Sequence, residues 1–274
     1  MAGLPEQFEW SDINLKDVSQ IRELCHLLND NYAEDDDNLF RYNYSPEFLQ
    51  WSLLVPGWQS QWHCGVREKK STCLIGFFAA YPQTIKVLDK EMKIVATNFL
   101  CVHKKYRSKK LGRLLIEEMR RRVNLNGIDK AIFAGDLEHI PVESAEAKRC
   151  HTLRCYFRSL NCKKLIDSGF SQLGKSMTID RTLKAYKVPD ITYTSLRPLE
   201  VKDLGETQKL LENHLKQYKL APIFDREQHH MIRTADLCYA VATSVHLKQL
   251  MNDALIVANQ MGFDVLKCSR PFEK

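Results

Sequence analysis

Apolar residues recur at helical spacing in several stretches of the chain. The first stretch, positions 12 to 31, predicts an amphipathic helix that ends near Asn29. Its apolar positions are Ile13, Leu15, Val18, Ile21, Leu24, Leu27 and Leu28. Positions 48 to 54 predict a short second helix, which Pro56 and Gly57 end. Positions 247 to 261 predict a late helix, capped by Gly262 and followed by a strand in FDVL.

Another helix is predicted directly after a run of basic residues. Its buried stripe consists of Leu111, Leu114, Leu115, Met119 and Val123. The charged residues Glu117, Glu118 and Arg120 to Arg122 are expected to face the solvent, and Gly127 is the expected C-cap.

Alternating or continuous apolar runs predict the strands. They are HCGVRE at 63–68, CLIGFFAAYPQTIKVL at 73–88, residues 93–102 and AIFAG at 131–135. The resulting order of helix, helix, strands, basic turn, helix and strand predicts a mixed α+β or α/β layer.

A polar, proline-containing connector, YKVPDITYT at 186–194, separates two parts of the chain. We therefore expect a first lobe at 1–187 and a second lobe at 190–274. The second lobe begins with a strand-turn-helix pattern in residues 196–218. Its roughly 85 residues are few for an independent core, so it is expected to lean on the first lobe.

Charge and cysteine usage limit the class of protein. Forty basic residues against 34 acidic ones give a net charge of +6, which is too mild to favour a nucleic-acid partner. No apolar run approaches the roughly 18 residues of a membrane span, and the nine cysteines form no CxxC pair, so we expect a cytoplasmic protein with reduced thiols. Cys150, His151 and Cys155 form the one local metal-like cluster, but the second cysteine pair of a zinc site is missing, and no metal is expected.

The segment NFLCVHKKYRSKKLG, from Asn98 to Gly112, delivers an apolar strand into a cationic turn that opens a helix. Unpaired amides at a helix N-terminus, together with lysine charges, bind anions such as phosphate, and Gly112 allows close approach to the backbone. The alternative explanations for the basic run are a solvent-exposed charged face, a nuclear-import signal or a nucleic-acid-binding patch. The buried strand argues against an import signal, and the lack of interleaved aromatic residues argues against nucleic acid. The run RSKKLG also approximates the R-x-x-G-x-G phosphate loop of GCN5-related acetyltransferases, with Lys110 at the first glycine.

Several long blocks closely resemble the glycylpeptide N-tetradecanoyltransferase (N-myristoyltransferase) family, in family order. They are NYAEDDDNLFRYNYSPEFLQW, PGWQSQWHCGVR, NFLCVHKKYRSKK, MTIDRTLKAYKVP, LRPLEVKDL and LMNDALIVANQMGFDV. The resemblance implies an α+β fold with an acetyltransferase-like mixed sheet flanked by helices, and a second, truncated lobe of the same kind. It implies myristoyl transfer from myristoyl-CoA, a co-substrate, to the N-terminal glycine of proteins by a monomer that needs no metal or other cofactor.

The resemblance also implies residue roles. The backbone amides of Phe99 and Leu100 would form an oxyanion hole, and Cys101 and Val102 would complete the thioester site. Ser108, Lys110, Leu111 and Gly112 would cradle the phosphates of CoA, while Asp35, Asp37, Phe40 and Tyr42 would line the groove for the substrate peptide. The alternatives are core packing for 99–102 and a polar capping loop for the aspartates; the ligand spacing of a calcium loop is absent.

The chain departs from the family pattern at several points. It lacks an upstream aromatic segment and most of the central sheet of the second lobe, and Cys155, Tyr156 and Phe157 replace aromatic and histidine positions of the family's peptide site. The family uses its C-terminal carboxylate as the base, whereas this sequence ends at Lys274 soon after GFDV. The second hypothesis is therefore a catalytically inactive member that binds acyl-CoA or peptides.

Overall fold

The computed structural model describes residues 3–32, 41–134, 153–189, 196–223, 236–237, 245–263 and 265–271. The chain divides into two compact units, one of residues 1–147 with 219–228 and the other of residues 148–218 with 229–274. Each unit has a sheet of its own. The lobe boundary expected near 186–194 stays a prediction.

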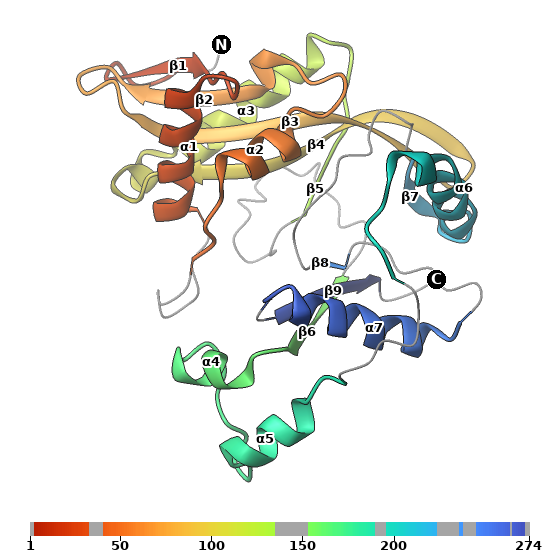
Figure 1. Ribbon diagram of the computed structural model, residues 1–274. Coiled ribbons are helices and arrows are strands. Elements are labelled where there is room, and N and C mark those ends of the chain that lie inside the picture. The colour runs from red at the N-terminus through yellow and green to blue at the C-terminus, as the bar shows by residue number, and fades with distance from the viewer. Residues whose placement is uncertain are drawn as a thin grey trace. The chain divides into compact units, whose positions relative to one another are not determined.

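A six-stranded sheet forms the centre of the first unit (Figure 1). Its strands are β1 (Phe8–Asp12), β2 (His63–Glu68), β3 (Leu74–Val87), β4 (Lys90–Val102), β5 (Ala131–Phe133) and β7 (Leu220–Pro222). The first five lie in sequence order, and β7 pairs with the far end of β3. All pairs are antiparallel except β4 with β5. The predicted mixed sheet is confirmed.

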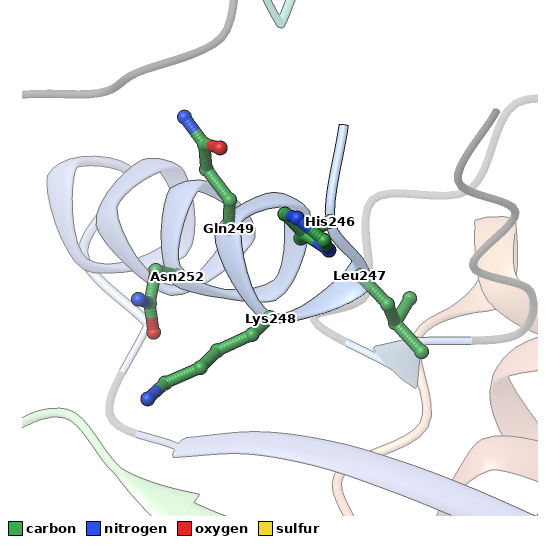
Figure 2. Close-up of a pocket in the computed structure, with 5 residues that line it drawn as sticks. All are labelled: His246, Leu247, Lys248, Gln249 and Asn252. Atoms are coloured by element: carbon green, nitrogen blue, oxygen red, sulfur yellow. The ribbon is translucent and has the colours of Figure 1, made fainter. Parts of the chain in front are cut away.

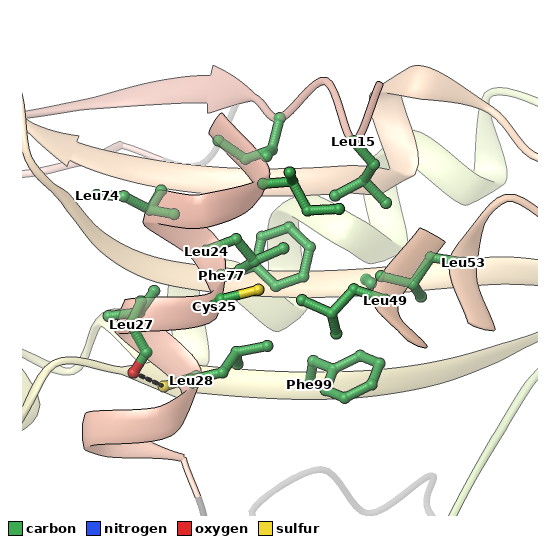
Figure 3. Packing of buried hydrophobic residues seen from close by; sticks show 14 residues of the cluster. Leu15, Leu24, Cys25, Leu27, Leu28, Leu49, Leu53, Leu74, Phe77 and Phe99 are labelled. Carbon is green, nitrogen blue, oxygen red and sulfur yellow. Dashed lines mark hydrogen bonds between the residues drawn. The ribbon is translucent and has the colours of Figure 1, made fainter. Parts of the chain in front are cut away.

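Helices cover both faces of this sheet, with α1 (Val18–Asn31) and α2 (Pro46–Leu53) on one face and α3 (Leu111–Asn124) on the other (Figure 1). Successive strand residues point to opposite faces. Phe77 therefore packs in the cluster under α1 and α2, whereas Phe78 packs in the cluster with α3. Figure 3 shows the first cluster, in which Phe99 of β4 lies beside Leu49 of α2.

The first helix begins later than its apolar periodicity predicts. Residues 8–12 form β1, an element that we did not predict, and α1 starts only at Val18. The reason is Asp17, whose carboxylate accepts hydrogen bonds from the amides of Ser19 and Gln20 and so caps the helix. The apolar residues before the cap are buried without being helical.

Two charged residues of α3 are buried, contrary to the outward orientation that we predicted. Glu118 is fully buried and Arg122 is 7% exposed. Glu118 accepts hydrogen bonds from Arg121 and Arg122, and Arg122 also donates to Asp12 and to the carbonyl of Gln61. Mutual neutralisation makes this burial tolerable.

The second unit contains a three-stranded sheet of β6 (Leu153–Ser159), β9 (Val265–Pro271) and β8 (Asp236–Leu237). Its helices are α4 (Cys162–Asp167), α5 (Ile179–Tyr186), α6 (Leu204–Leu215) and α7 (Leu247–Gln260). The strand predicted at the start of 196–218 does not form. A 3₁₀ turn, Val201–Asp203, precedes α6 instead, held by a capping box between Glu200 and Asp203. None of the helices described in either unit is long and apolar enough to cross a membrane.

Candidate acyl-CoA site

Strand β4 carries a bulge at the start of the segment singled out by the sequence. Ala79 of β3 pairs with Asn98, but Phe77 pairs with Cys101, so Phe99 and Leu100 together oppose a single residue. Phe99 adopts the left-handed conformation, with φ of 58°. A non-glycine residue in this region costs on the order of 1 kcal/mol and persists only where its surroundings enforce it.

Packing enforces the conformation of Phe99. Its side chain is 2% exposed, and its ring lies 5.4 Å from that of Tyr44, edge-on, and 5.8 Å from that of Tyr32. The buried side chain fixes the direction of the backbone at the bulge.

Two hydrogen-bond donors converge on one oxygen at the bulge. The amide of Phe99 donates to Oδ1 of Asn98 at 2.8 Å, and the hydroxyl of Tyr32 lies 3.2 Å from the same oxygen. Burial raises the pKa of Tyr32, which keeps its hydroxyl protonated and able to donate. The acceptor, Asn98 Oδ1, is a carbonyl oxygen on an exposed side chain. The carbonyl oxygen of a ligand could therefore take the same position if this side chain moved away.

The basic turn after β4 is a 3₁₀ helix, Lys104–Lys109, tied to its surroundings by several contacts. The side chain of His103 accepts a hydrogen bond from the amide of Lys105. The hydroxyl of Tyr106 donates to Glu68 at 2.9 Å, and the Tyr106 ring meets Phe8 edge-on at 5.6 Å. These contacts hold the turn against the sheet.

The N-terminus of α3 opens from this turn without a capping side chain. Lys110, at the N-cap position, has φ of 57° and makes no side-chain capping bond, and the first turn of α3 holds no acidic residue. The exposed residues around it are Lys104, Lys105, Arg107, Ser108, Lys109 and Lys110. A Cβ atom added to Gly112 would contact only Val102 Cγ2, at 4.0 Å. The space beside the Gly112 backbone is therefore free of other atoms of the described residues, and a ligand could approach it. Uncapped helix amides and exposed lysines thus lie in the same short stretch of chain, a combination that favours anion binding.

The remaining residues of the predicted CoA site lie in the core. Cys101 and Leu111 are buried, and Val102 is half-buried. The Sγ atom of Cys101 lies 3.9 Å from the carbonyl of Leu27, and burial raises the pKa of this thiol to about 12. Such a thiol is a packing group and not a nucleophile. Any contact that these residues make with CoA would involve their backbone.

The predicted peptide site is described only in part. Asp35, Asp37 and Phe40 lie outside the described residues, as do Cys150 and His151 of the metal-like cluster. Tyr42 is exposed, and its ring stacks on that of Tyr44 at 5.8 Å. Tyr44 in turn stacks on Phe48 of α2 and contacts Phe99, so an aromatic row leads from Tyr42 to the bulge. Within the described residues, no group of three or more His, Cys, Asp or Glu side chains could hold a metal ion.

Four further residues, Asn31, Tyr32, Asn98 and Arg107, have no role predicted from the sequence. All four contact the bulge or the basic turn. Asn98 and Arg107 stand inside segment 98–112, and Asn31 and Tyr32 begin the block NYAEDDDNLFRYNYSPEFLQW, so all four lie in stretches that carry the resemblance. The fold then brings the end of α1 next to the bulge and the basic turn.

A shallow hollow lies at the first turn of α7 in the second unit (Figure 2). Its lining residues are His246, Leu247, Lys248, Gln249 and Asn252. Figure 2 shows these side chains pointing in different directions from a single helix. They do not form a converging set of catalytic or binding groups.

Comparison with known proteins identifies the family. The sequence model for "Myristoyl-CoA:protein N-myristoyltransferase, N-terminal domain" matches residues 1–145, and that for the C-terminal domain matches residues 167–236. Glycylpeptide N-tetradecanoyltransferase 2 of Bos taurus is 41% identical over 96% of this chain and 60% of its own length. The Drosophila melanogaster enzyme is 41% identical over 96% of this chain and 63% of its own length.

Solved structures agree with the sequence matches. Saccharomyces cerevisiae N-myristoyltransferase with bound myristoyl-CoA superposes with a TM-score of 0.84 at 28% identity, covering 97% of this chain and 74% of that one. The chain thus spans about 60% of the length of the first relatives that it matches. With both domain models matched in order, the chain belongs to the N-myristoyltransferase family.

Proposed function

We propose that the chain transfers a myristoyl group from myristoyl-CoA to the N-terminal glycine of proteins. The observation that carries the proposal is the continuity of residues 98–112, where a strained bulge with converging donors leads directly into an uncapped, lysine-rich helix start. An acyl-CoA carries a thioester carbonyl and, on its coenzyme A part, phosphates, and the segment offers a partner for each.

In the proposed reaction, the glycine amine attacks the thioester carbonyl carbon. The amides of Phe99 and Leu100 stabilise the oxyanion that forms, with the Tyr32 hydroxyl as an additional donor. The C–S bond then breaks and CoA leaves as its thiolate, and the proton that the amine loses as the new amide forms neutralises this thiolate. No covalent enzyme intermediate is invoked, because the neighbouring thiol, Cys101, is buried and protonated.

The substrate oxygen would replace Asn98 Oδ1 as the acceptor for Phe99. Ser108, Lys110 and the amides of Leu111 and Gly112 would hold the phosphates. Asp35, Asp37, Phe40 and Tyr42 would line the peptide groove. We further propose that the chain acts in the cytoplasm as a monomer.

The second candidate is a member that binds acyl-CoA without turnover. The observation in its favour is that the Phe99 amide already donates to Asn98, so the predicted oxyanion hole is occupied by the chain itself. Replacing Asn98 Oδ1 by the thioester oxygen as the acceptor of the Phe99 amide costs little free energy, because one hydrogen bond is exchanged for a similar one. We therefore favour the enzyme.

A transfer assay with labelled myristoyl-CoA tests the choice between the enzyme and the binding member. It uses a peptide that starts with glycine and the same peptide starting with alanine. The enzyme proposal predicts label in the glycine peptide alone. A parallel titration with myristoyl-CoA separates the other outcomes. Binding without transfer would support the binding member, and the absence of both would overturn the acyl-CoA site.

A further inference from the structure

Asn31, the last residue of α1, contacts the basic turn through a buried side chain. The residue is 5% exposed. Its Nδ2 donates to the carbonyl of Leu27 at 2.9 Å, and its Oδ1 accepts from the amide of Lys104 at 3.1 Å. Both ends of the side-chain amide are therefore satisfied, which fixes its orientation.

The backbone carbonyl of the same residue holds the other end of the turn. Arg107 Nη2 donates to Asn31 O at 2.6 Å, and Arg107 Nε lies 3.4 Å from the carbonyl of Val102. Residues 104 and 107 are thus both tied to one position of α1. Arg107, the arginine of the R-x-x-K-x-G run, directs these donors to backbone carbonyls.

We infer that Asn31 is a positioning residue for the phosphates of coenzyme A, an inference that rests on the proposed function. Asn31 is uncharged and buried, so it touches no phosphate. It fixes the first residue of the turn, and the lysines that follow are thereby brought to the open end of α3. Without this contact the turn would have to be ordered on binding, and ordering a few residues weakens affinity by about tenfold or more.

Asn29 supplies a matched control on the same helix. Its side chain hydrogen-bonds to the side chain of Asn43 and to the backbone amide and carbonyl of Tyr44. All three bonds go to the segment before α2, and not to the basic turn. Asn29→Ala and Asn31→Ala each remove a hydrogen-bonding amide, so urea unfolding of both variants measures the general cost of that loss.

Titration with coenzyme A at low and high salt tests the inference. Asn31→Ala should weaken binding by about tenfold at both salt concentrations, because no charge is lost, while Asn29→Ala should stay within about twofold of the wild type. Lys110→Ala should instead reduce the salt dependence. Equal affinities for the two asparagine variants would overturn the inference.

Amide hydrogen exchange without ligand separates this inference from the proposed function. Asn31→Ala should accelerate exchange at Lys104 and along the turn, and Asn29→Ala should not. Asn31→Asp, which keeps the acceptor, should restore protection at Lys104. Unchanged exchange in Asn31→Ala would overturn the positioning role of Asn31 even if coenzyme A binds. A wild-type chain that binds no coenzyme A would instead overturn the proposed function.

Discussion

Lys110 shows how one residue combines strain with charge. It holds a left-handed conformation, φ 57°, at the position where the acetyltransferase phosphate loop has its first glycine. A side chain there costs on the order of 1 kcal/mol. The lysine charge lies at the start of α3, where an anion would bind.

Two substitutions separate these effects. Lys110→Gly and Lys110→Ala both remove the charge, but only glycine adopts this conformation without strain. We expect the free energy of unfolding of the glycine variant to exceed that of the alanine variant by about 1 kcal/mol. The extra conformational entropy that glycine gives to the unfolded chain reduces this difference. Both variants should lose the same affinity for coenzyme A. Chemical denaturation and titration measure the two quantities, and equal stabilities would show that the position carries no strain.

His63 is a buried histidine of the first unit. It is fully buried, its ring stacks on Trp58 at 5.4 Å, and its Nε2 lies 3.3 Å from the carbonyl of Leu53. Burial lowers its pKa to about 4 from the ordinary 6.5. The unfolded chain therefore binds a proton between about pH 6.5 and 4 that the folded chain does not bind.

Stability should consequently fall as the pH drops through that window. From pH 7 to pH 5, this histidine should remove about 2 kcal/mol from the free energy of unfolding. His63→Gln should show a decrease that is smaller by that amount, whatever its own stability at pH 7. Urea titrations at the two pH values check this, and parallel losses in both proteins would show that His63 titrates normally.

At the scale of elements, periodicity predicted the first unit well, because its helices and strands each bury one clear face. Strands β2 to β5 and helices α2 and α3 are confirmed. The start of α1 was wrong because a local cap, Asp17, outweighs apolar spacing. Helices α4 and α5 were not predicted. Each is short and begins at a polar cap, Asn161 or Thr178, so it contains too few apolar positions to show a helical period.

The charged face of α3 shows what sequence spacing cannot show. Glu117 and Glu118 are adjacent, yet Glu117 pairs with Arg113 in solvent while Glu118 is buried between Arg121 and Arg122. Glu118→Gln should lower the free energy of unfolding by about 3 kcal/mol, because Arg122 is left buried with less compensation. Glu117→Gln is the control, with an expected cost below about 0.5 kcal/mol. Similar costs in urea unfolding would contradict the role of the buried network.

At the scale of the whole molecule, the resemblance located the candidate site but not its geometry. The bulge at Phe99 depends on pairing with β3, and the contacts of Asn31 and Tyr32 depend on where α1 ends. Neither is written in the local sequence of residues 98–112. The acidic peptide loop lies outside the described residues, so its role stays a prediction.

A pair of peptides tests that loop. If Asp35 and Asp37 bind a substrate cation, changing both to Asn should weaken binding of a glycine peptide with a lysine near its start by several-fold, more at low salt than at high salt. The same peptide with alanine in place of the lysine should be barely affected. Equal losses for the two peptides, measured by titration, would indicate collapse of the loop instead.

In the proposed site, the turn after the Phe99 bulge binds the phosphates of an acyl-CoA. A myristoyl-CoA titration of the triple variant Lys104→Glu, Lys105→Glu and Lys110→Glu tests this binding. Its control reverses the same number of exposed lysines elsewhere in the first unit: Lys90, Lys93 and Lys130. We expect the first variant to lose binding while it unfolds at nearly the wild-type urea concentration, and the control to keep its affinity. Undiminished affinity in the first variant, or an equal loss in both, would show that the turn does not bind the phosphates.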